Sequence, residues 1–350
     1  MLFRQLFDSE SCTFTYLLAS GTGSEALIID PVLSKVERYL KLFEELDLKL
    51  AKAIDTHVHA DHITALGALR DETNCITVMG KQSSADVVSM RIEDGDKIEI
   101  DGVCLDVMYT PGHTNDSYSF YSPGMVFTGD TLLIRGTGRT DFQQGSSQEA
   151  YHSLFDKLLK LPDETIVYPG HDYKGDSTST IGEERAYNPR LQVVSAKEYT
   201  DIMDNLGLAN PKMMDVAVPA NQKIGMSQEE PEITERTIPA FDAVARLEDK
   251  AAIFIDLRED PEREKNGVIP NSVHVPYKSL ADYIKPGGLL AALTQQSSQQ
   301  LMLYCAYGER SAMALKELRS AGFKNIRHLG GGIDAWVNAD GPIEAPPSLN

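Results

Sequence analysis

The pattern of hydrophobic and polar positions predicts a regular succession of short strands and helices. Aromatic and β-branched residues concentrate in residues 2–6, 13–19 and 26–30, which we expect to form strands. Apolar residues then recur at helical spacing, which predicts an amphipathic helix over residues 34–46. Another short apolar run, over residues 51–55, is expected to be a strand. The chain thus begins as a mixed α/β structure.

Three later apolar strands each end in a glycine-containing turn that carries a potential metal ligand: His113 after strand 103–109, Asp130 after strand 125–128, and His171 after strand 165–168. Turns at strand ends are where a rigid sheet presents side chains to a cleft. Any one of these residues alone is as readily explained as a turn or capping residue. Their repetition predicts that they converge on one site.

The amino-acid composition of the chain changes after about residue 210. A stretch rich in Pro, Gly, Gln, Glu and Ser predicts a linker over residues 221–237. Beyond it, short apolar strands at 253–256, 273–275 and 301–304 alternate with helical segments near 278–284 and 311–320. In the first half, a helix is also expected near 63–70. Such alternation predicts a second α/β domain with a small, mostly parallel sheet.

The length of 350 residues suffices for two domains, which we place at residues 1–220 and 238–345. A hydrophobic content of 42% supports real cores. The net charge of −19 argues against nucleic acid or an anionic membrane as the main partner. Solubility is the simpler explanation of the excess acidic residues.

The cysteines and the N-terminus suggest a reducing compartment. The four cysteines show no pair at zinc-ligand spacing, and we expect Cys12, Cys75 and Cys104 to be small buried hydrophobes. The N-terminus lacks a basic region followed by a long apolar run. No apolar run reaches membrane-spanning length. We therefore expect a cytoplasmic protein without a membrane partner.

The densest chemistry lies in Thr56–His62, directly after the apolar run at 51–55. This segment, Thr-His-Val-His-Ala-Asp-His, places three imidazoles and one carboxylate within six residues. Neutral imidazole suits Zn, Fe, Ni and Cu, and a carboxylate adds charge. An isolated histidine is more often a polar residue satisfied in a core. Three histidines with an aspartate at this spacing predict a metal site.

Residues 1–220 resemble the metallo-β-lactamase fold, an αββα sandwich with metals at one edge of its two sheets. The motif His57-x-His59-x-Asp61-His62, followed by His113, Asp130 and His171, carries the resemblance. More narrowly, four segments resemble the persulfide dioxygenases: Thr56–Thr64, Thr131–Gly145 with its Arg139-Thr140-Asp141-Phe142 run, His171-Asp172-Tyr173, and Asn188-Pro189-Arg190-Leu191. Members of that family oxidise the sulfane sulfur of glutathione persulfide to sulfite with O₂.

The resemblance implies one Fe(II) per dioxygenase domain, held by His57, His113 and Asp130. It places His59, Asp61, His62 and His171 around the cleft without a second metal, and it assigns Arg139, Tyr173 and Arg190 to glutathione contact. A two-histidine, one-carboxylate triad leaves open positions, as in non-haem iron oxygenases. An arginine fork suits a glutathione carboxylate, although a structural ion pair is the alternative for each arginine.

A dinuclear zinc thioester hydrolase of the glyoxalase II type is the alternative. Its two metals would take His57, His59 and His113 on one side and Asp61, His62 and His171 on the other, with Asp130 as the bridge. That enzyme usually carries a further histidine where this chain has Val58. It also lacks the run at 139–142, so the resemblance favours the dioxygenase.

A second candidate site begins at Cys305, between an expected strand and an expected helix. Backbone N–H groups of the loop, the helix N-terminus and Arg310 would lower the pKa of this thiol and stabilise a cysteine persulfide. The region 238–340 resembles the rhodanese sulfurtransferases, through the Cys305–Arg310 loop, Asp256–Glu259, Gly267–Ser272 and Gly330–Trp336. Val268 departs from the family, in which many members carry histidine. Related phosphatases use a longer loop and are the alternative for this domain.

Together the resemblances imply a persulfide dioxygenase–rhodanese fusion. Its first domain would convert glutathione persulfide, O₂ and water to sulfite and glutathione. Cys305 would pass sulfane sulfur between thiosulfate or sulfite and glutathione, in a direction that the sequence leaves open. The family often pairs, so a homodimer is compatible with the resemblance. A non-catalytic module is the alternative for either domain, but the ligand set and the cysteine are complete.

Overall fold

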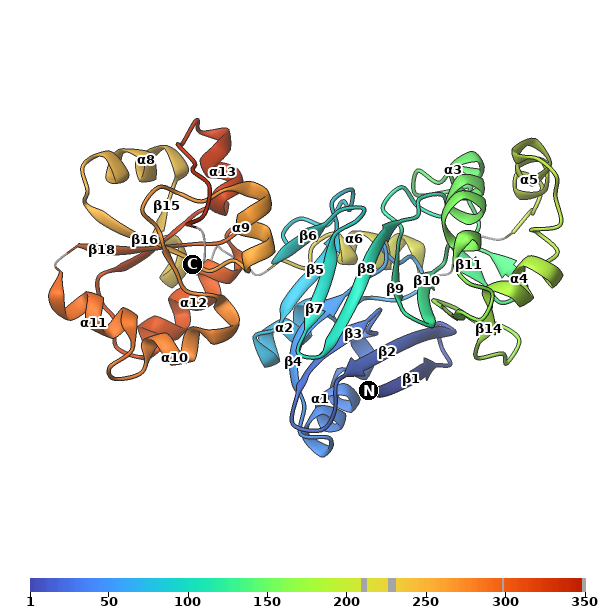
Figure 1. Ribbon diagram of the computed structural model, residues 1–350, viewed down its shortest axis with the longest axis horizontal. Coiled ribbons are helices and arrows are strands. Elements are labelled where there is room, and N and C mark those ends of the chain that lie inside the picture. The colour runs from blue at the N-terminus through green and yellow to red at the C-terminus, as the bar shows by residue number, and fades with distance from the viewer. Residues whose placement is uncertain (209–212, 226–230, 298, 348–350) are drawn as a thin grey trace. The chain divides into compact units, whose positions relative to one another are not determined.

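A computed structural model describes residues 1–208, 213–225, 231–297 and 299–347. These residues form two compact units, the first comprising Met1–Asp86 and Arg91–Ile224 and the second comprising Val87–Met90 and Gly225–Asn350. Figure 1 labels their helices and strands. Part of the predicted linker, residues 226–230, lies outside the described residues.

The first unit is built on two six-stranded sheets. The first sheet has the order β1-β2-β3-β4-β5-β6, with strands Leu2–Asp8, Thr13–Ala19, Glu25–Ile29, Lys49–Ile54, Ile76–Gly80 and Met90–Ile92. Its first three strands are antiparallel neighbours, whereas β3, β4 and β5 run parallel. Every residue of β2 is buried, which explains why the sequence of this strand is apolar without strict alternation.

The second sheet has the order β14-β13-β10-β9-β8-β7. In chain order its strands are Lys97–Ile100, Val103–Tyr109, Tyr118–Ser122, Met125–Gly129, Ile166–Pro169 and Ser179–Thr180. Strand β8 begins with alternating buried and exposed residues, as expected for a strand with one solvated face. Strands β8, β10 and β13 are the three whose ends were predicted to carry ligands.

Helices accompany both sheets (Figure 1). They are α1 Val36–Glu45, α2 Leu66–Thr73, α3 Ser147–His152, α4 Ile181–Tyr187, α5 Ala196–Met203 and α6 Met214–Asn221. Helix α2 packs on β4 and β5, and α3 packs on α5. Beneath α3 and α5, Leu154 and Leu158 share a buried core with Val126 and Val167 of the second sheet.

The second unit contains a five-stranded sheet with the order β15-β19-β18-β16-β17. Its strands are Thr237–Ile238, Ala252–Asp256, Val273–His274, Gln300–Tyr304 and Ile326–Leu329, numbered in chain order, and neighbouring strands are parallel. The predicted parallel sheet is confirmed. The unit's helices are α7 Pro231–Thr234, α8 Ala240–Glu248, α9 Asp260–Asn266, α10 Leu280–Ile284, α11 Leu289–Gln296, α12 Glu309–Ser320 and α13 Gly332–Asn338.

One helix begins later than predicted. The sequence pattern placed it over 63–70, but α2 starts at Leu66 because the preceding residues pair with another segment. Leu33 N donates to the Ile63 carbonyl at 2.8 Å, and Ala65 N donates to the Pro31 carbonyl at 2.7 Å. The first of these bonds uses the Ile63 carbonyl, which a helix beginning at residue 63 would need for its own hydrogen bonding.

The cysteine prediction is partly wrong. Cys75 is buried, but Cys104 is exposed and Cys12 is half-buried. Cys104 lies on an outward-facing position of β8, where the alternation of the strand turns every second side chain to solvent.

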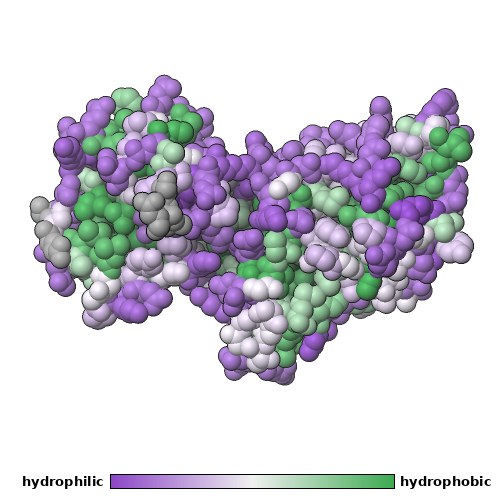
Figure 2. Space-filling view, in the orientation of Figure 1, coloured by the Kyte–Doolittle hydropathy of each residue, from purple (hydrophilic) through white to green (hydrophobic). Residues whose placement is uncertain are grey.

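The surface fits the acidic, polar composition. The face in Figure 2 is largely hydrophilic, with apolar side chains in scattered groups. Among the described residues, no helix combines the length and apolar character needed to cross a bilayer.

Candidate active sites

Two buried side chains from distant segments hold the histidine-rich loop that follows β4. Asp30, just after β3, accepts hydrogen bonds from Thr56 N at 2.7 Å and Thr56 Oγ1 at 3.0 Å, and it lies 3.2 Å from His59 Nε2. Asn221, at the end of α6, donates to the carbonyls of His59 and His62 at 2.9 and 2.8 Å. The loop is thereby fixed before any ligand binds.

The predicted triad is assembled. Ligand atoms of His57, His113 and Asp130 all lie within 4.8 Å of one another, and all three residues are buried. His113 comes from the turn after β8 and Asp130 from the turn after β10, as the strand pattern predicted. His113 Nε2 lies 3.5 Å from Asp130 Oδ2. The triad therefore brings two imidazoles and one carboxylate to a single point.

Hydrogen bonds on the far side of each imidazole fit the triad to a metal. His113 Nδ1 donates to the Arg139 carbonyl at 2.7 Å, which leaves the Nε2 lone pair of His113 free. Thr56 gives its one hydroxyl hydrogen to Asp30, so Thr56 Oγ1 accepts from His57 Nδ1 at 2.9 Å. Both rings thus hold the tautomer that a metal ligand requires.

Electrostatics favour the same ionisation states. Burial, together with the neighbouring His59 and His113, holds the pKa of His57 well below its usual range, so this ring is neutral. Burial raises the pKa of the Asp130 carboxyl, but the charge of His171 and its hydrogen bond outweigh burial and lower the pKa below its usual range. Asp130 is therefore an anion beside neutral His57.

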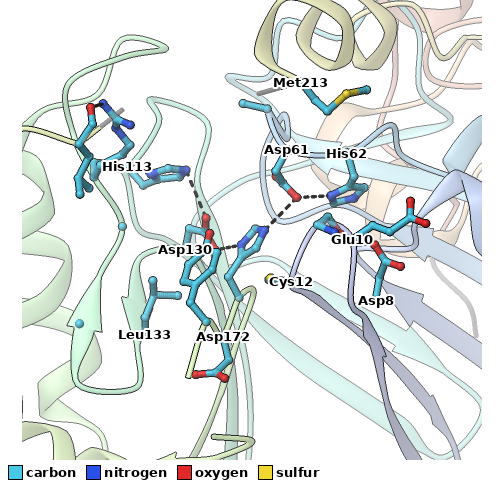
Figure 3. A pocket seen from close by; sticks show the side chains of 18 of the residues that line it. Asp8, Glu10, Cys12, Asp61, His62, His113, Asp130, Leu133, Asp172 and Met213 are labelled. Atoms are coloured by element: carbon cyan, nitrogen blue, oxygen red, sulfur yellow. Dashed lines mark hydrogen bonds and ion pairs between the residues drawn. The ribbon is translucent and has the colours of Figure 1, made fainter. Parts of the chain in front are cut away.

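His171 connects the triad to a second cluster, in which the side chains of Asp61 and His62 face one another (Figure 3). Its Nδ1 donates to Asp130 Oδ1 at 2.6 Å, and its Nε2 lies 2.9 Å from Asp61 Oδ2. His62 Nδ1 lies 2.7 Å from the same Asp61 oxygen. Both ring nitrogens of His171 thus face carboxylates.

The second cluster differs from the grouping that the zinc hydrolase would need. Ligand atoms of His59, Asp61 and His62 lie within 4.8 Å of one another. The hydrolase set would instead place His59 with His57 and His113, and would require His171 as a ligand. In this structure His59 faces Asp30, and His171 is held between two carboxylates.

A cavity of about 1180 Å³ opens over the triad. Most of the residues that the sequence predicted to bind metal or substrate line this cavity. Eight of them line it: Asp61, His62, His113, Asp130, Arg139, His171, Tyr173 and Arg190. His57 and His59 are buried, at 2% and 0% exposure. The predicted metal and substrate residues are thus parts of one site.

The three predicted substrate residues occupy different settings in this cavity. Arg139 Nε donates to Asp141 Oδ1 at 2.6 Å, so this arginine already has an ionic partner. Arg190 donates to the Thr137 carbonyl. Tyr173 is 69% exposed, and its ring stacks on His171 with centroids 5.8 Å apart. The cavity mouth therefore combines cationic and aromatic side chains.

The second site places a buried thiol at the end of β18. Cys305 is 0% exposed, and Gly308 N donates to its Sγ at 3.2 Å. The loop carbonyls are held from α13, where Ile333 N donates to the Cys305 carbonyl at 2.9 Å. Helix α12 starts directly after Gly308, so its N-terminus adds positive potential near the sulfur.

Arg310 is buried beneath this loop and paired. Its Nη1 and Nη2 donate to the Glu262 carboxylate at 2.7 and 2.6 Å, and Nη2 also donates to the Ser89 carbonyl at 3.0 Å. Burial lowers the pKa of Arg310, but Glu262 outweighs burial and raises it further above its usual range. The guanidinium therefore supports the loop as a fixed charge.

Sequence reasoning missed several residues that hold these sites: Asp30, Thr56, Glu262 and Asn221. Asp30 directly follows a buried strand and precedes a proline, which is the same strand-end position as the predicted ligands. That position was a usable signal. Glu262 and Asn221 carry no comparable local signal, because their partners lie far away in the sequence.

Comparisons with known proteins fit both sites. Residues 13–171 match the metallo-beta-lactamase superfamily model, and residues 240–339 match the rhodanese-like domain model. The mitochondrial persulfide dioxygenase ETHE1 of Homo sapiens is 47% identical over 229 residues, covering 65% of this chain and 89% of that protein. A probable hydroxyacylglutathione hydrolase of Schizosaccharomyces pombe is 30% identical over 237 residues, covering 58% of this chain and 90% of that protein.

A solved structure supports the closer relationship. The crystal structure of ETHE1 from Myxococcus xanthus is 51% identical and superposes with a TM-score of 0.62, covering 63% of this chain and 98% of that chain. Both predicted folds are thereby confirmed, and the metallo-β-lactamase fold implies a bound metal, for which the buried His57, His113 and Asp130 offer ligands. The chain therefore belongs to the persulfide dioxygenase family of metallo-β-lactamase-fold proteins, joined here to a C-terminal rhodanese domain.

Proposed function

We propose that the domain at residues 1–220 oxidises glutathione persulfide with O₂ to sulfite and glutathione, using one Fe(II) held by His57, His113 and Asp130. The observation that carries this proposal is the buried triad, in which both imidazoles are fixed as Nδ1–H tautomers. Bound Fe(II) would supply one-electron chemistry toward O₂, which redox-silent zinc lacks.

The cavity residues would bind and orient the persulfide. Arg139 and Arg190 line the cavity, and the planar N–H fork of an arginine matches the geometry of a glutathione carboxylate. Tyr173 can donate its hydroxyl to the substrate from the rim. Because His113 and Asp130 are 6% and 8% exposed, a bound substrate would readily exclude water from the triad.

The direct test is to load the protein anaerobically with Fe(II), add glutathione persulfide, and follow dissolved O₂ and sulfite. We expect stoichiometric O₂ loss with sulfite formation. His113→Ala should abolish uptake, whereas His152→Ala, at an exposed histidine of the same unit, should not. Absence of O₂ uptake, together with hydrolysis of a glutathione thioester by the zinc-loaded protein, would favour the hydrolase alternative.

We further propose that the domain at residues 238–345 is a sulfurtransferase in which Cys305 carries sulfane sulfur between thiosulfate or sulfite and glutathione. The Gly308 N–H group and the start of α12 both favour a thiolate at Cys305. Incubation with thiosulfate should add one sulfur to the Cys305 peptide, as seen by mass spectrometry. Cys305→Ser should abolish transfer to glutathione, and Cys104→Ser, at an exposed cysteine, should retain it.

A further inference from the structure

A row of hydrogen-bonded side chains lies behind Cys305, and the proposed sulfur transfer leaves it unused. Ser311 Oγ lies 3.8 Å from Cys305 Sγ and 3.2 Å from His328 Nδ1. On the other side of the ring, Thr237 Oγ1 lies 2.8 Å from His328 Nε2. Cys305, Ser311 and His328 are all 0% exposed. The row therefore connects a buried thiol to β15 at the edge of the sheet.

Each member of this row has a single hydrogen to give. Burial lowers the pKa of His328 to about 4, so its ring is neutral near pH 7 and carries one N–H group. Ser311 and Thr237 each carry one hydroxyl hydrogen. The direction of each bond therefore fixes the direction of the next, and only two arrangements satisfy both ring nitrogens.

In the first arrangement the ring hydrogen is on Nε2 of His328. It donates to Thr237 Oγ1, and Thr237 then donates to the Ile233 carbonyl, 2.9 Å away. The bare Nδ1 must accept, so Ser311 gives its hydrogen to His328. Cys305 Sγ receives no hydrogen from Ser311 in this arrangement.

In the second arrangement the ring hydrogen is on Nδ1 of His328. It donates to Ser311 Oγ, and Thr237 donates to Nε2. The Ser311 hydrogen is then available either to the Gly308 carbonyl at 3.0 Å or to Cys305 Sγ.

In both arrangements the two backbone carbonyls beside the row, those of Ile233 and Gly308, keep a hydrogen-bond donor. When Thr237 turns away from Ile233, that carbonyl still accepts from Arg236 N at 2.9 Å. When Ser311 turns away from Gly308, that carbonyl still accepts from Ala312 N at 3.0 Å. Because no buried polar group is left without a partner, the two arrangements can interconvert at small cost.

We propose that His328 is a positioning residue for sulfur transfer: its tautomer decides whether the Ser311 hydroxyl donates to the Cys305 sulfur. This inference rests on the proposed role of Cys305. In the transfer step, an acceptor thiolate forms a new S–S bond with the outer sulfur of the Cys305 persulfide. The bond between that sulfur and Sγ breaks, and its electron pair stays on Sγ as the thiolate.

The row gives this leaving thiolate a second donor. Gly308 N already donates to Sγ, and the Nδ1–H tautomer of His328 releases the Ser311 hydroxyl to do the same. While the persulfide is intact, Sγ carries no charge, and the hydroxyl can return to His328 Nδ1. Hydrogen bonds to a charged acceptor are stronger than those to a neutral one, so charge on Sγ selects the Nδ1–H tautomer.

The charged groups that face Cys305 do not take over the role of the Ser311 hydroxyl as a donor to Sγ. Arg310 interacts electrostatically with Cys305, Glu262 and Glu259. Its guanidinium donates to both oxygens of the Glu262 carboxylate, so the two charges largely offset each other at the sulfur. Short-range donors to Sγ should therefore have a measurable effect on the thiol pKa.

The test is the titration of the Cys305 thiolate in the full chain by its ultraviolet absorbance. Each variant is compared with the same variant carrying Cys305→Ser, which isolates the signal of this thiol. Ser311→Ala should raise the midpoint by about one pH unit, since it removes one hydrogen bond to the charged form. Ser320→Ala, at an exposed serine of the same helix, should leave the midpoint unchanged.

Two substitutions of His328 distinguish the role of its Nδ1 from the role of its Nε2. The amide N–H of His328→Asn takes the place of Nδ1–H, so the midpoint should stay close to that of the wild type. The longer His328→Gln places its amide near the Nε2 position and leaves Ser311 without that donor, so the midpoint should rise as in Ser311→Ala. Fluorescence of Trp336 verifies that each variant is folded.

Unchanged midpoints in folded Ser311→Ala and His328→Gln would overturn the proposal, and so would an equal rise in His328→Asn and His328→Gln. Thiolate titration does not require sulfur transfer. If the midpoints shift as expected while wild-type protein fails to move sulfur from thiosulfate to glutathione, the tautomer inference holds and the proposed sulfurtransferase function fails.

Discussion

At the scale of single residues, the second unit contains a fully buried ion pair, formed by Arg258 and Asp256. Arg258 is 0% exposed and donates from Nε and Nη2 to the two oxygens of Asp256 at 2.9 and 2.8 Å. The Tyr304 hydroxyl donates to the same carboxylate at 2.8 Å. This pair indicates a structural role for Arg258, because its removal would leave the buried Asp256 carboxylate with Arg263 Nε, 3.4 Å away, as its remaining charged partner.

Arg258→Leu should lower the free energy of unfolding of the second unit by about 3–5 kcal/mol, the usual effect of breaking a buried ion pair. Urea unfolding followed by Trp336 fluorescence measures this, since Trp336 is the one tryptophan of the chain and is buried in that unit. Lys285→Leu removes the exposed ion pair with Asp282 and should cost at most about 1 kcal/mol. Equal effects of the two substitutions would contradict the assignment.

His328 makes the stability of the second unit depend on pH. Burial lowers its pKa to about 4 in the folded chain, whereas an unfolded histidine titrates near about 6.5. Above that value neither state is protonated. Below it the unfolded chain binds the proton first, so stability is lost as the pH falls from about 6.5 toward the folded pKa.

Wild-type protein should therefore lose about 2–3 kcal/mol more stability between about pH 6.5 and 4 than His328→Asn does. Urea unfolding at several pH values, again followed by Trp336 fluorescence, gives the two curves. Parallel curves would show that His328 is not the group responsible. His152→Asn, at an exposed histidine, provides the matched control and should follow the wild type.

At the same scale, the sequence identified ligands more readily than their supports. His57, His59, Asp61 and His62 fall within six residues, so their local spacing carries the prediction. Asp30 contacts His59 across 29 positions of the chain. A contact of that separation depends on the pairing of β3 with β4, which no local pattern encodes.

At the scale of elements, the turn that carries His113 packs closely against helix α3, and this packing holds the turn in place. Gly112 has a φ of +141°, and a Cβ at this position would lie 2.3 Å from Ala150 Cα. Ser146 N donates to the Gly112 carbonyl at 2.9 Å, and Ser153 Oγ donates to the Pro111 carbonyl at 2.6 Å. The turn is thus docked on the helix at a point where only glycine fits.

Gly112→Ala should cost about 1–3 kcal/mol of stability, as overpacking does, and should reduce iron binding at least tenfold by displacing His113. Iron content after loading and washing measures the second effect. Gly21→Ala meets no atom within 4 Å and should change neither quantity. Full iron binding by Gly112→Ala would show that the docked turn does not set the position of His113.

Strands and helices were predicted from the sequence where their apolar residues form a clear run or a clear helical repeat. In the second unit the short buried runs at 253–256, 273–275 and 301–304 were sufficient to predict β16, β17 and β18, whereas β15 and β19 were not predicted. Helices α3, α4 and α5 have 6, 7 and 8 residues, which is too short for a clear helical period, and sequence analysis did not predict them. Their positions depend on packing over the second sheet.

At the scale of the whole molecule, each compact unit contains its own candidate site. The metal triad lies entirely in the first unit, and Cys305, Ser311 and His328 lie entirely in the second. The change in composition after residue 210 was enough to predict two domains, because each must bury its own core.

Separate sites imply separable activities. Cys305→Ser should abolish sulfur transfer and leave O₂ uptake with ready-made glutathione persulfide within about twofold of the wild type, since the thiol and the triad belong to different compact units. His113→Ala should do the reverse. Parallel assays on the same preparations check this, and equal loss of both activities in either variant would contradict it.

The bridge formed by His171 between Asp61 and Asp130 bears on how such pockets diverge. In the proposed one-iron site, hydrogen bonds would keep His171 from a metal without any substitution of this residue. A lineage can therefore alter the metal stoichiometry of its pocket while every histidine and aspartate stays in place. Selection acting on the surrounding loops and carboxylates would be sufficient, and the change in chemistry would precede any change in the ligand inventory.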